Sequence, residues 1–142
     1  MPNIRWLLAL ITRCHRWLFL TTGGRLGDRV FGFRFLLLEH VGRKTGAARR
    51  TPLLYVEDAG RFVVAASNAG DPREPAWWLN LQSSPEARVR IGRREVEVKA
   101  RAAEPAEQSA LWAKLCESYS YFETYRERAG REIPVVLLET TG

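Results

Sequence analysis

The sequence predicts a single α+β domain in which a six-stranded, mostly antiparallel sheet curls into a small barrel with flanking helices. The expected strands are joined mainly by short turns, and hairpin connections are typical of antiparallel rather than parallel sheets. The chain has 142 residues, of which 46% are apolar and 27% charged. This length and composition fit one globular domain with a substantial core.

The expected elements follow the order α-β-β-β-α-β-β-α-α-β. The strands are predicted at residues 33–41, 51–57, 61–67, 87–91, 94–101 and 133–139. Strict alternation of apolar and polar residues predicts 87–91 and 94–101, whereas 133–139 is a dense apolar run expected near the centre of the sheet. A short helix is expected to end before Pro85, and a helical pattern runs from Pro105 to Gly130.

The N-terminal part, residues 1–32, is expected to form an amphipathic helix and a basic linker ahead of the domain at 33–142. Residues 4–20 would place arginines on one face and leucines on the other, with Trp6 and Trp17 at the boundary. Such a helix suits a membrane interface, and packing against the domain or a partner subunit is the alternative. Its longest apolar run, 6–11, is too short to span a bilayer.

The charge and the cysteines limit the classes of function. A net charge of +6 favours an anionic partner such as nucleic acid, a membrane surface or a phosphorylated small molecule. Cys14 and Cys116 form no CxxC pattern, which indicates a reduced cytoplasmic chain without a disulfide framework or zinc site. His15 and His40 are the only histidines and are expected to be ordinary surface or strand residues, so no metal is predicted.

The segment "GRKTGAARR" combines two glycines with four cations between two predicted strands. Gly42 and Gly46 permit a tight bend in which successive backbone N–H groups can bind an anion. An arginine such as Arg49 can donate two parallel hydrogen bonds to phosphate or carboxylate. The glycine spacing of a P-loop is missing. Taken alone, the segment also fits a solvated basic hairpin.

Two aromatic segments are further candidates for a binding site. Trp77, Trp78 and Asn80 begin a helix after a loop of small residues, where a flat ligand could approach the backbone. Tyr119, Phe122 and Tyr125 recur at helical spacing. Core packing is the alternative for both groups. Neither contains an acid–base pair, an activated nucleophile or a metal cluster, so any chemistry would come from an organic cofactor.

These motifs occur together in an order that resembles a known family. "GRKTG" between two strands, "AS" before a proline-containing loop, "PAWWLN", an aromatic helix and the terminal "REIPVVLLE" are similar to the deazaflavin (coenzyme F420)-dependent nitroreductase family. The resemblance covers residues 36–139. It implies a split β-barrel of the flavin-reductase and pyridoxamine-phosphate-oxidase type that binds F420 and transfers its hydride.

The resemblance also implies the residues of the site. F420 carries a phosphodiester and an oligoglutamate tail, which the basic turn would complement. The expected cofactor-binding residues are Arg43, Lys44, Thr45, Arg49, Arg50, Thr51, Pro52, Leu53, Ser67, Asn68, Ala69, Gly70, Trp77 and Asn80. The expected substrate pocket contains Trp78, Tyr119, Phe122 and Tyr125, with Tyr119 and Tyr125 as the hydrogen-bond donors to the acceptor.

Several positions depart from better-known members of that family. Phe122 stands where nitroimidazole-reducing relatives carry a tyrosine, and Leu79 where relatives commonly have histidine. Ala69 and Asp71 replace smaller or neutral loop residues. The substrate therefore does not carry over, and we expect a quinone, an activated alkene or a nitro compound.

The residues alone leave several functions open. An FMN-binding split-barrel reductase would need fewer cations, because FMN has one short phosphate. A non-enzymatic deazaflavin carrier and a basic nucleic-acid binder also fit the basic turn and the aromatic residues, although no specific nucleic-acid binding is expected. The chain is expected to be a cytoplasmic monomer or homodimer, with membrane association on the cytoplasmic face as an option.

Overall fold

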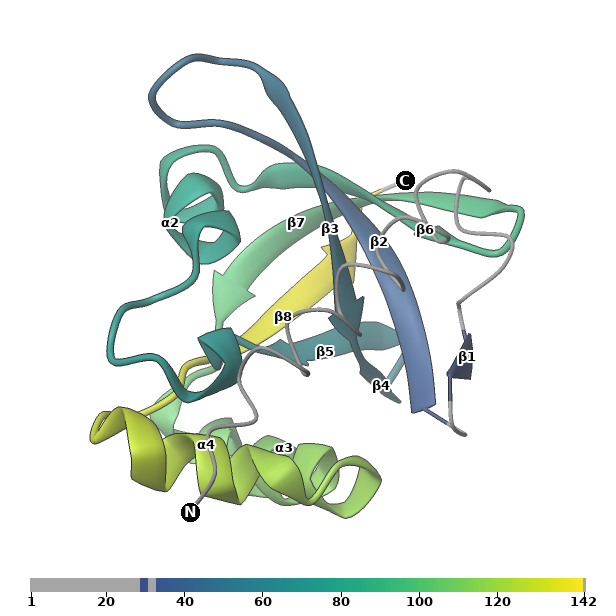
Figure 1. Cartoon of the computed structure of the whole chain (residues 1–142). Coiled ribbons are helices and arrows are strands. Elements are labelled where there is room, and N and C mark those ends of the chain that lie inside the picture. Colours follow the sequence, from purple (N-terminus) through teal and green to yellow (C-terminus); the bar gives the residue numbers. More distant parts are fainter. Residues whose placement is uncertain (1–28, 31–32, 142) are drawn as a thin grey trace.

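A curled antiparallel sheet dominates the computed structural model, which describes residues 29–30 and 33–141 (Figure 1). The predicted N-terminal helix and the rest of the linker lie outside these residues. The elements are β1 (Arg29–Val30), β2 (Phe33–Val41), β3 (Ala48–Leu54), β4 (Val56–Asp58), β5 (Arg61–Ala65), the 3₁₀ turn η1 (Asn68–Gly70), α2 (Ala76–Ser83), β6 (Glu86–Ile91), β7 (Arg94–Ala102), α3 (Pro105–Ser118), α4 (Tyr121–Ala129) and β8 (Val135–Thr140).

The strands are hydrogen-bonded in the order β1-β2-β6-β7-β8-β5-β4, and β3 pairs with β2 on the edge opposite β6. All seven pairings are antiparallel. The predicted α+β class and antiparallel curled sheet are therefore confirmed. Figure 1 shows the β2–β3 hairpin extending past the rest of the sheet, with α2 beside it and the pair α3 and α4 at the opposite end.

The prediction of six strands was wrong, because the described part of the chain contributes eight to the sheet. The expected strand at 51–57 divides at Tyr55, so that β3 pairs with β2 whereas β4 pairs with β5. Tyr55 is buried, and its backbone N–H donates to the Arg34 carbonyl at 3.1 Å. Its large side chain thus turns into the core where the chain passes between partners. The eighth strand is β1, a two-residue addition beside β2.

Two apolar clusters form the core, one inside the curled sheet and one between the sheet and the pair α3 and α4. β8 contributes to both, since Val136 and Leu138 face the first cluster while Val135 and Leu137 face the second. The dense apolar run of β8 is explained by this burial on both faces. Its predicted central position is confirmed, because β8 lies between β7 and β5.

The helical pattern from Pro105 to Gly130 is interrupted after Ser118. Tyr119 has extended backbone angles (φ −147°, ψ 97°) and separates α3 from α4, and Gly130, with φ 64°, caps the end of α4. Glu104 and Glu107 form a capping box at the start of α3, where Pro105 occupies the first turn. The break allows both helices to pack their apolar faces on the same side of the sheet.

Candidate functional site

The inner face of the β2–β3 hairpin changes from apolar to polar as the hairpin leaves the sheet. Leu36, Leu38 and His40 alternate along β2 and are all buried. Across the register, Leu36 pairs with Leu53, Leu38 with Thr51 and His40 with Arg49. Paired residues share a face, so the core face of the hairpin continues outward as a short polar surface.

The tip of the hairpin is a compact turn stabilised by its own backbone. The Gly42 N–H donates to the Ala47 carbonyl and the Gly46 N–H to the Gly42 carbonyl, each at 2.8 Å. Gly46 has φ +73°, which favours glycine. The Thr45 hydroxyl oxygen accepts a hydrogen bond from the Ala47 N–H at 3.2 Å. The turn therefore holds a defined shape without help from a ligand.

Asn80, on α2, anchors this turn to the body of the protein. Its side-chain oxygen Oδ1 accepts two hydrogen bonds from Arg43, one from the backbone N–H at 3.1 Å and one from Nη1 at 2.9 Å. Asn80 is 5% exposed. Arg43 is consequently oriented by a neutral amide, and its positive charge is not cancelled there.

His40 continues the same set of contacts into the hairpin. Its Nδ1 lies 3.1 Å from the Asn80 side-chain nitrogen, and its Nε2 lies 3.0 Å from the Thr51 hydroxyl oxygen. Burial, and secondarily the positive charge of Arg49, lowers the pKa of His40 from 6.5 to about 4. The imidazole is therefore neutral at physiological pH.

A pocket of about 310 Å³ lies between the hairpin and α2. Its lining contains eight of the predicted cofactor-binding residues, which are Arg43, Lys44, Thr45, Arg49, Arg50, Thr51, Trp77 and Asn80. His40, Gly42 and Ala76, which were not among those predictions, complete the lining. A second hollow, of about 480 Å³, shares Arg43 and Ala76 with the first and also includes Asn68 and Arg73. The two hollows thus meet at Arg43.

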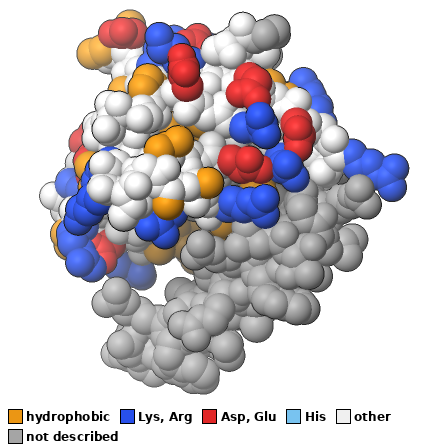
Figure 2. Space-filling view, turned by 90° about the horizontal axis from the view of Figure 1, so that it is seen from above, with side chains coloured by type: hydrophobic (Ala, Val, Ile, Leu, Met, Phe, Trp, Pro, Cys, Tyr) orange, Lys and Arg blue, Asp and Glu red, His pale blue; other side chains and the backbone are white. Residues whose placement is uncertain are grey.

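Three cations of the turn differ from arginines such as Arg61 and Arg101, which bind carboxylates elsewhere in the fold. Within residues 33–141, no carboxylate forms an ion pair with Arg43, Lys44 or Arg49. Figure 2, viewed from the hairpin end, shows cations gathered along one edge with few carboxylates between them. Uncompensated positive charge beside a pocket fits a polyanionic ligand.

The loop after β5 leads to α2 and packs against α4. Asn68, Ala69 and Gly70 all have positive φ angles, of 47°, 52° and 85°. A Cβ added to Gly70 would lie 3.0 Å from Arg128 Cδ and 3.3 Å from Tyr125 Cα, so the loop packs directly on the helix. β5 ends at Ala65, two residues before the predicted end of the strand at Ser67. Ser67 itself is buried.

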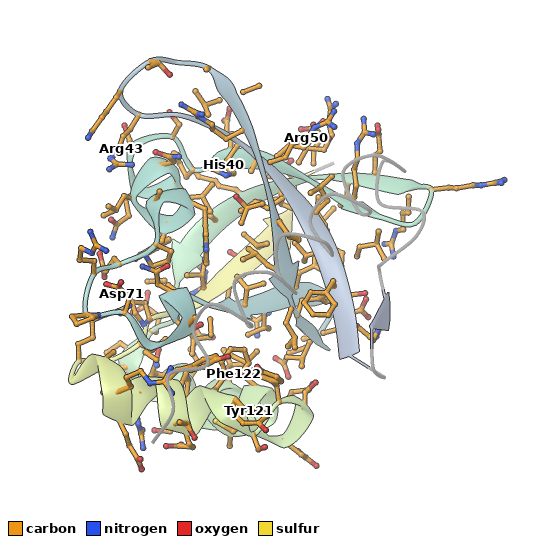
Figure 3. All side chains as sticks on the ribbon, in the orientation of Figure 1. His40, Arg43, Arg50, Asp71, Tyr121 and Phe122 are labelled. Carbon is orange, nitrogen blue, oxygen red and sulfur yellow. The ribbon has the colours of Figure 1, made fainter. Side chains whose placement is uncertain are left out.

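The predicted substrate-pocket residues lie mainly in the two cores. Trp78 belongs to the cluster inside the sheet, and Phe122 is 4% exposed against Trp112 in the other cluster. The hydroxyl oxygens of Tyr119 and Tyr125 are 2.9 Å apart, and burial together with this contact raises the pKa of Tyr119. In Figure 3, Phe122 and Tyr121 lie at the opposite end of the molecule from His40 and Arg43.

His40 is the site residue that sequence reasoning missed. It was expected to be an ordinary strand or surface residue, and it does lie in a strand. The structure adds that both ring nitrogens contact polar partners beside the pocket. The alternation of Leu36, Leu38 and His40 was the available signal, because period-2 spacing places all three on one face.

Two further structural observations concern metals and membranes. Across the described part of the chain, no group of three or more histidine, cysteine or acidic side chains is arranged to hold a metal ion. Within the same residues, no helix has the length and apolar character needed to cross a bilayer.

Comparison with known proteins assigns the chain to a family. The family model described as "F420H(2)-dependent quinone reductase" matches residues 11–140. The chain belongs to this family. The predicted recognition is thereby confirmed, and the family names indicate F420 as the cofactor and an oxidoreductase as the class of enzyme. A quinone is among the acceptors expected from the sequence.

Individual relatives agree with the family assignment. An F420H(2)-dependent quinone reductase of Mycobacterium tuberculosis (strain ATCC 25618 / H37Rv) is 34% identical over 97% of this chain and 98% of that protein. A solved F420-H2 dependent reductase is 32% identical, covers 74% of this chain and 93% of its own, and superposes with a TM-score of 0.68. Another solved structure, described as a domain-swapped dimer, is 29% identical, covers 87% and 94% of the two chains, and has a TM-score of 0.71.

Proposed function

We propose that this protein reduces a quinone with F420H2, and that the basic turn of the β2–β3 hairpin binds the anionic tail of the coenzyme. The observation that carries the proposal is the pocket between the hairpin and α2. Three of the cations that line it, Arg43, Lys44 and Arg49, have no carboxylate partner among the described residues. The chain belongs to the F420H(2)-dependent quinone reductase family, whose coenzyme has an anionic tail.

The proposed tail-binding residues differ in whether another side chain fixes their orientation. Arg43 is oriented by Asn80, so its guanidinium is available in one place with little further ordering. Lys44 and Arg49 supply additional charge, and the Thr45 hydroxyl and Arg50 also line the pocket. The contacts proposed for Arg43, Lys44 and Arg49 join charged donors to charged acceptors, and such hydrogen bonds are the stronger class.

The ring of the coenzyme is proposed to extend from the pocket toward the loop after β5. Thr51, Pro52 and Leu53 would form the floor, and the loop 67–70 would pass close to the ring through small side chains. Trp77 is 6% exposed and would contact the coenzyme only through an edge. Trp78, which is buried inside the curled sheet, would support the pocket from behind, and Phe122 would support the tyrosine pair from the other core.

When bound, F420H2 supplies a hydride, and a quinone that accepts this hydride and one proton becomes a quinol. The tyrosine pair is proposed to serve the acceptor. When Tyr119 donates to the Tyr125 oxygen, the Tyr125 hydroxyl still has its own proton to donate to an acceptor oxygen. The raised pKa of Tyr119 keeps its phenol protonated, as a hydrogen-bond donor must be.

A quinone-reduction assay with three electron donors tests this function. The purified protein is mixed with a water-soluble quinone and with F420H2, reduced FMN or NADH, and the appearance of the oxidised donor is followed against a protein-free control. The proposal expects quinone-dependent oxidation of F420H2 and little activity with reduced FMN or NADH. Equal rates with reduced FMN would favour the FMN alternative. Tight F420 binding with no turnover of any acceptor would favour a carrier.

The proposal extends to the type of barrel and to the assembly of the protein. We infer a split β-barrel of the flavin-reductase type, because the antiparallel sheet curls around an apolar interior. A homodimer is the proposed assembly and a monomer its alternative, since a relative with similar structure is described as a domain-swapped dimer. Light scattering of the full chain distinguishes the two.

Peripheral membrane contact is proposed for residues 4–20, which lie outside the described residues, on the basis of their amphipathic pattern. The test is co-sedimentation with anionic vesicles. Deleting residues 1–20 should abolish sedimentation while F420 binding persists, and unchanged sedimentation of the truncated chain would contradict the idea.

A further inference from the structure

A directional chain of hydrogen bonds runs from the basic turn to the floor of the pocket. It contains Arg43, Asn80, His40 and Thr51, which come from the turn, α2, β2 and β3. His40 and Asn80 are each 5% exposed, whereas Thr51 is partly exposed and lines the pocket. Figure 3 shows His40 beneath the tip of the hairpin and close to Arg43.

The direction of the chain follows from its first member. Arginine and the backbone N–H can only donate, so the atom of Asn80 that meets both Arg43 donors must be the oxygen. Reversing the amide would place an NH2 group against two donors. The Asn80 nitrogen therefore faces His40 and donates to Nδ1.

The next two steps are then fixed. Because Nδ1 of His40 accepts, a neutral imidazole must carry its proton on Nε2. That N–H donates to the Thr51 hydroxyl oxygen, 3.0 Å away. The hydroxyl can accept this bond and still has its own proton to donate. In the described structure, Thr51 makes no second side-chain hydrogen bond that would take that proton.

We propose that Thr51 is a hydrogen-bond donor to an anionic oxygen of the bound ligand, and that Asn80 and His40 are positioning residues that impose this polarity. The inference rests on the proposed function, because it assigns Thr51 a contact within the same pocket. The expected partner is a phosphoryl or carboxylate oxygen, since Arg49 on the same face of β3 favours negative charge there.

Nitrogen-15 NMR of the ligand-free protein tests the polarity without any ligand. The chain has two histidines, so a His15→Gln variant assigns the signals. His40 should show a protonated Nε2 and an unprotonated Nδ1, and should not titrate between pH 8 and about pH 5. A proton on Nδ1, or an ordinary titration near 6.5, would overturn the inference whatever the protein binds.

Binding of F420 tests the donor. Thr51→Val removes the hydroxyl at nearly constant shape and should weaken binding about tenfold, the usual effect of losing one hydrogen bond to a charged group. Thr51→Ser keeps the hydroxyl and should stay within about threefold of the wild type. Thr140→Val makes the same change at an exposed strand position outside the pocket and should have no effect. Unaltered binding by Thr51→Val would refute the donor role.

Two shortened deazaflavins identify which oxygen is bound. If Thr51 contacts the phosphodiester, the effect of Thr51→Val persists in a coenzyme without glutamates and disappears in one without the phosphodiester. If it contacts a glutamate carboxylate, the effect disappears in both. Should the wild type bind no F420, the proposed function fails. The same comparison of Thr51 variants with inorganic phosphate then decides this inference separately, and equal phosphate binding would refute it.

Discussion

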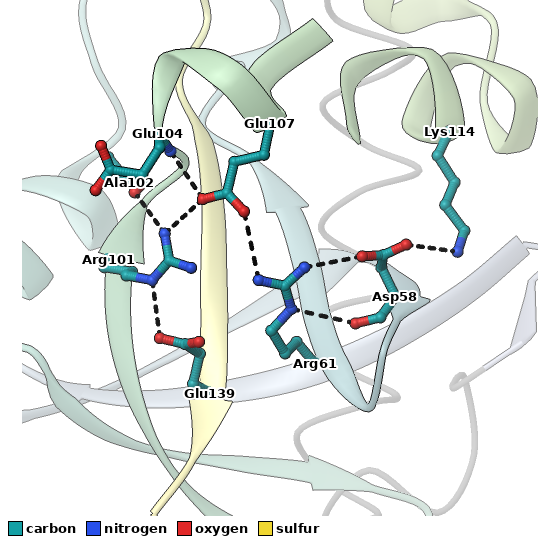
Figure 4. A network of polar contacts seen from close by, with 8 residues as sticks. All are labelled: Asp58, Arg61, Arg101, Ala102, Glu104, Glu107, Lys114 and Glu139. Atoms are coloured by element: carbon teal, nitrogen blue, oxygen red, sulfur yellow. Dashed lines mark hydrogen bonds and ion pairs between the residues drawn. The ribbon is translucent and has the colours of Figure 1, made fainter. Parts of the chain in front are cut away.

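Two arginine-containing regions of the molecule differ in whether their cations are paired with carboxylates. In the first, strands β4, β5, β7 and β8 meet α3 through a network in which each cation binds a carboxylate (Figure 4). Arg61 binds Asp58 and Glu107, and Arg101 binds Glu107 and Glu139, at 2.6–3.5 Å. In the second, the hairpin turn, Arg43, Lys44 and Arg49 have no such partner among the described residues.

The difference separates two uses of the same residue types. The network joins α3 to the sheet through ion pairs. Because its positive charges are balanced by carboxylates, it attracts an anionic ligand only weakly. The turn takes its shape from backbone hydrogen bonds and Asn80 rather than from ion pairs. Its cations repel one another until an anion arrives. Changes in the turn should therefore affect binding, and changes in the network should affect stability.

The largest expected effect is on F420 affinity in the double variant Lys44→Ala with Arg49→Ala. Each lost contact to a charged group should weaken binding about tenfold, giving about a 100-fold loss together. The free energy of unfolding should hardly change, since neither side chain has a carboxylate partner in the described structure. Calorimetric titration measures the affinity and urea unfolding the stability.

A matched control for this variant is Arg93→Ala with Arg94→Ala. Both residues are exposed at the turn between β6 and β7, and replacing them removes the same two charges far from the hairpin. The control should change F420 affinity by less than about threefold, through the screened overall field alone. A comparable loss in both double variants would mean that net charge, rather than the turn, attracts the coenzyme.

The next effect concerns the contact between the loop after β5 and α4. Gly60→Ala and Gly70→Ala both force alanine into a positive φ, at 78° and 85° respectively. Gly60 has open space, so its variant should lose only about 1 kcal/mol of stability. Gly70→Ala must also displace Arg128 and crowd Tyr125, so the loss should be about 2 kcal/mol or more. Equal losses by urea unfolding would show that the loop does not press on α4.

The smallest effect should come from Glu107→Gln in the network. Its hydrogen bond with Arg101, followed by that with the Glu104 backbone, lowers the pKa of Glu107 from 4.5 to about 2. Because the folded pKa lies below the unfolded one, the stabilisation is complete above pH 4.5 and is lost as the pH falls toward 2. Wild type and variant should thus differ slightly in urea midpoint at pH 7 and converge near pH 2. A difference that grows on acidification would contradict this sign.

Sequence reasoning located the hairpin well because its signals are local. The boundaries of β2 followed from the apolar run that begins at Phe33, and the turn from the glycines around Arg43. The division at Tyr55 was not predictable, since both halves have strand-like composition and only the tertiary pairing differs. The expected order included two consecutive helices before the last strand, but the position of the break at Tyr119 was not predicted, because no proline or glycine marks it.

The candidate site was predictable only where chemistry and resemblance coincided. The basic turn and Asn80 do lie together, as the resemblance implied. Phe122 and Trp78 instead pack in the cores, which was the alternative for aromatic residues at helical spacing. His40 escaped notice because its importance depends on Asn80, a residue 40 positions away that the fold brings within 3.1 Å.

The most direct test of the central claim is titration of the wild-type protein with oxidised F420 and, separately, with FMN, followed by ligand fluorescence. The proposed use of the hairpin predicts that F420 binds at micromolar or lower concentration, more tightly than FMN, and less tightly as salt rises because charged contacts are screened. Binding of FMN as tight as F420, or no change in F420 fluorescence at micromolar protein, would contradict the claim.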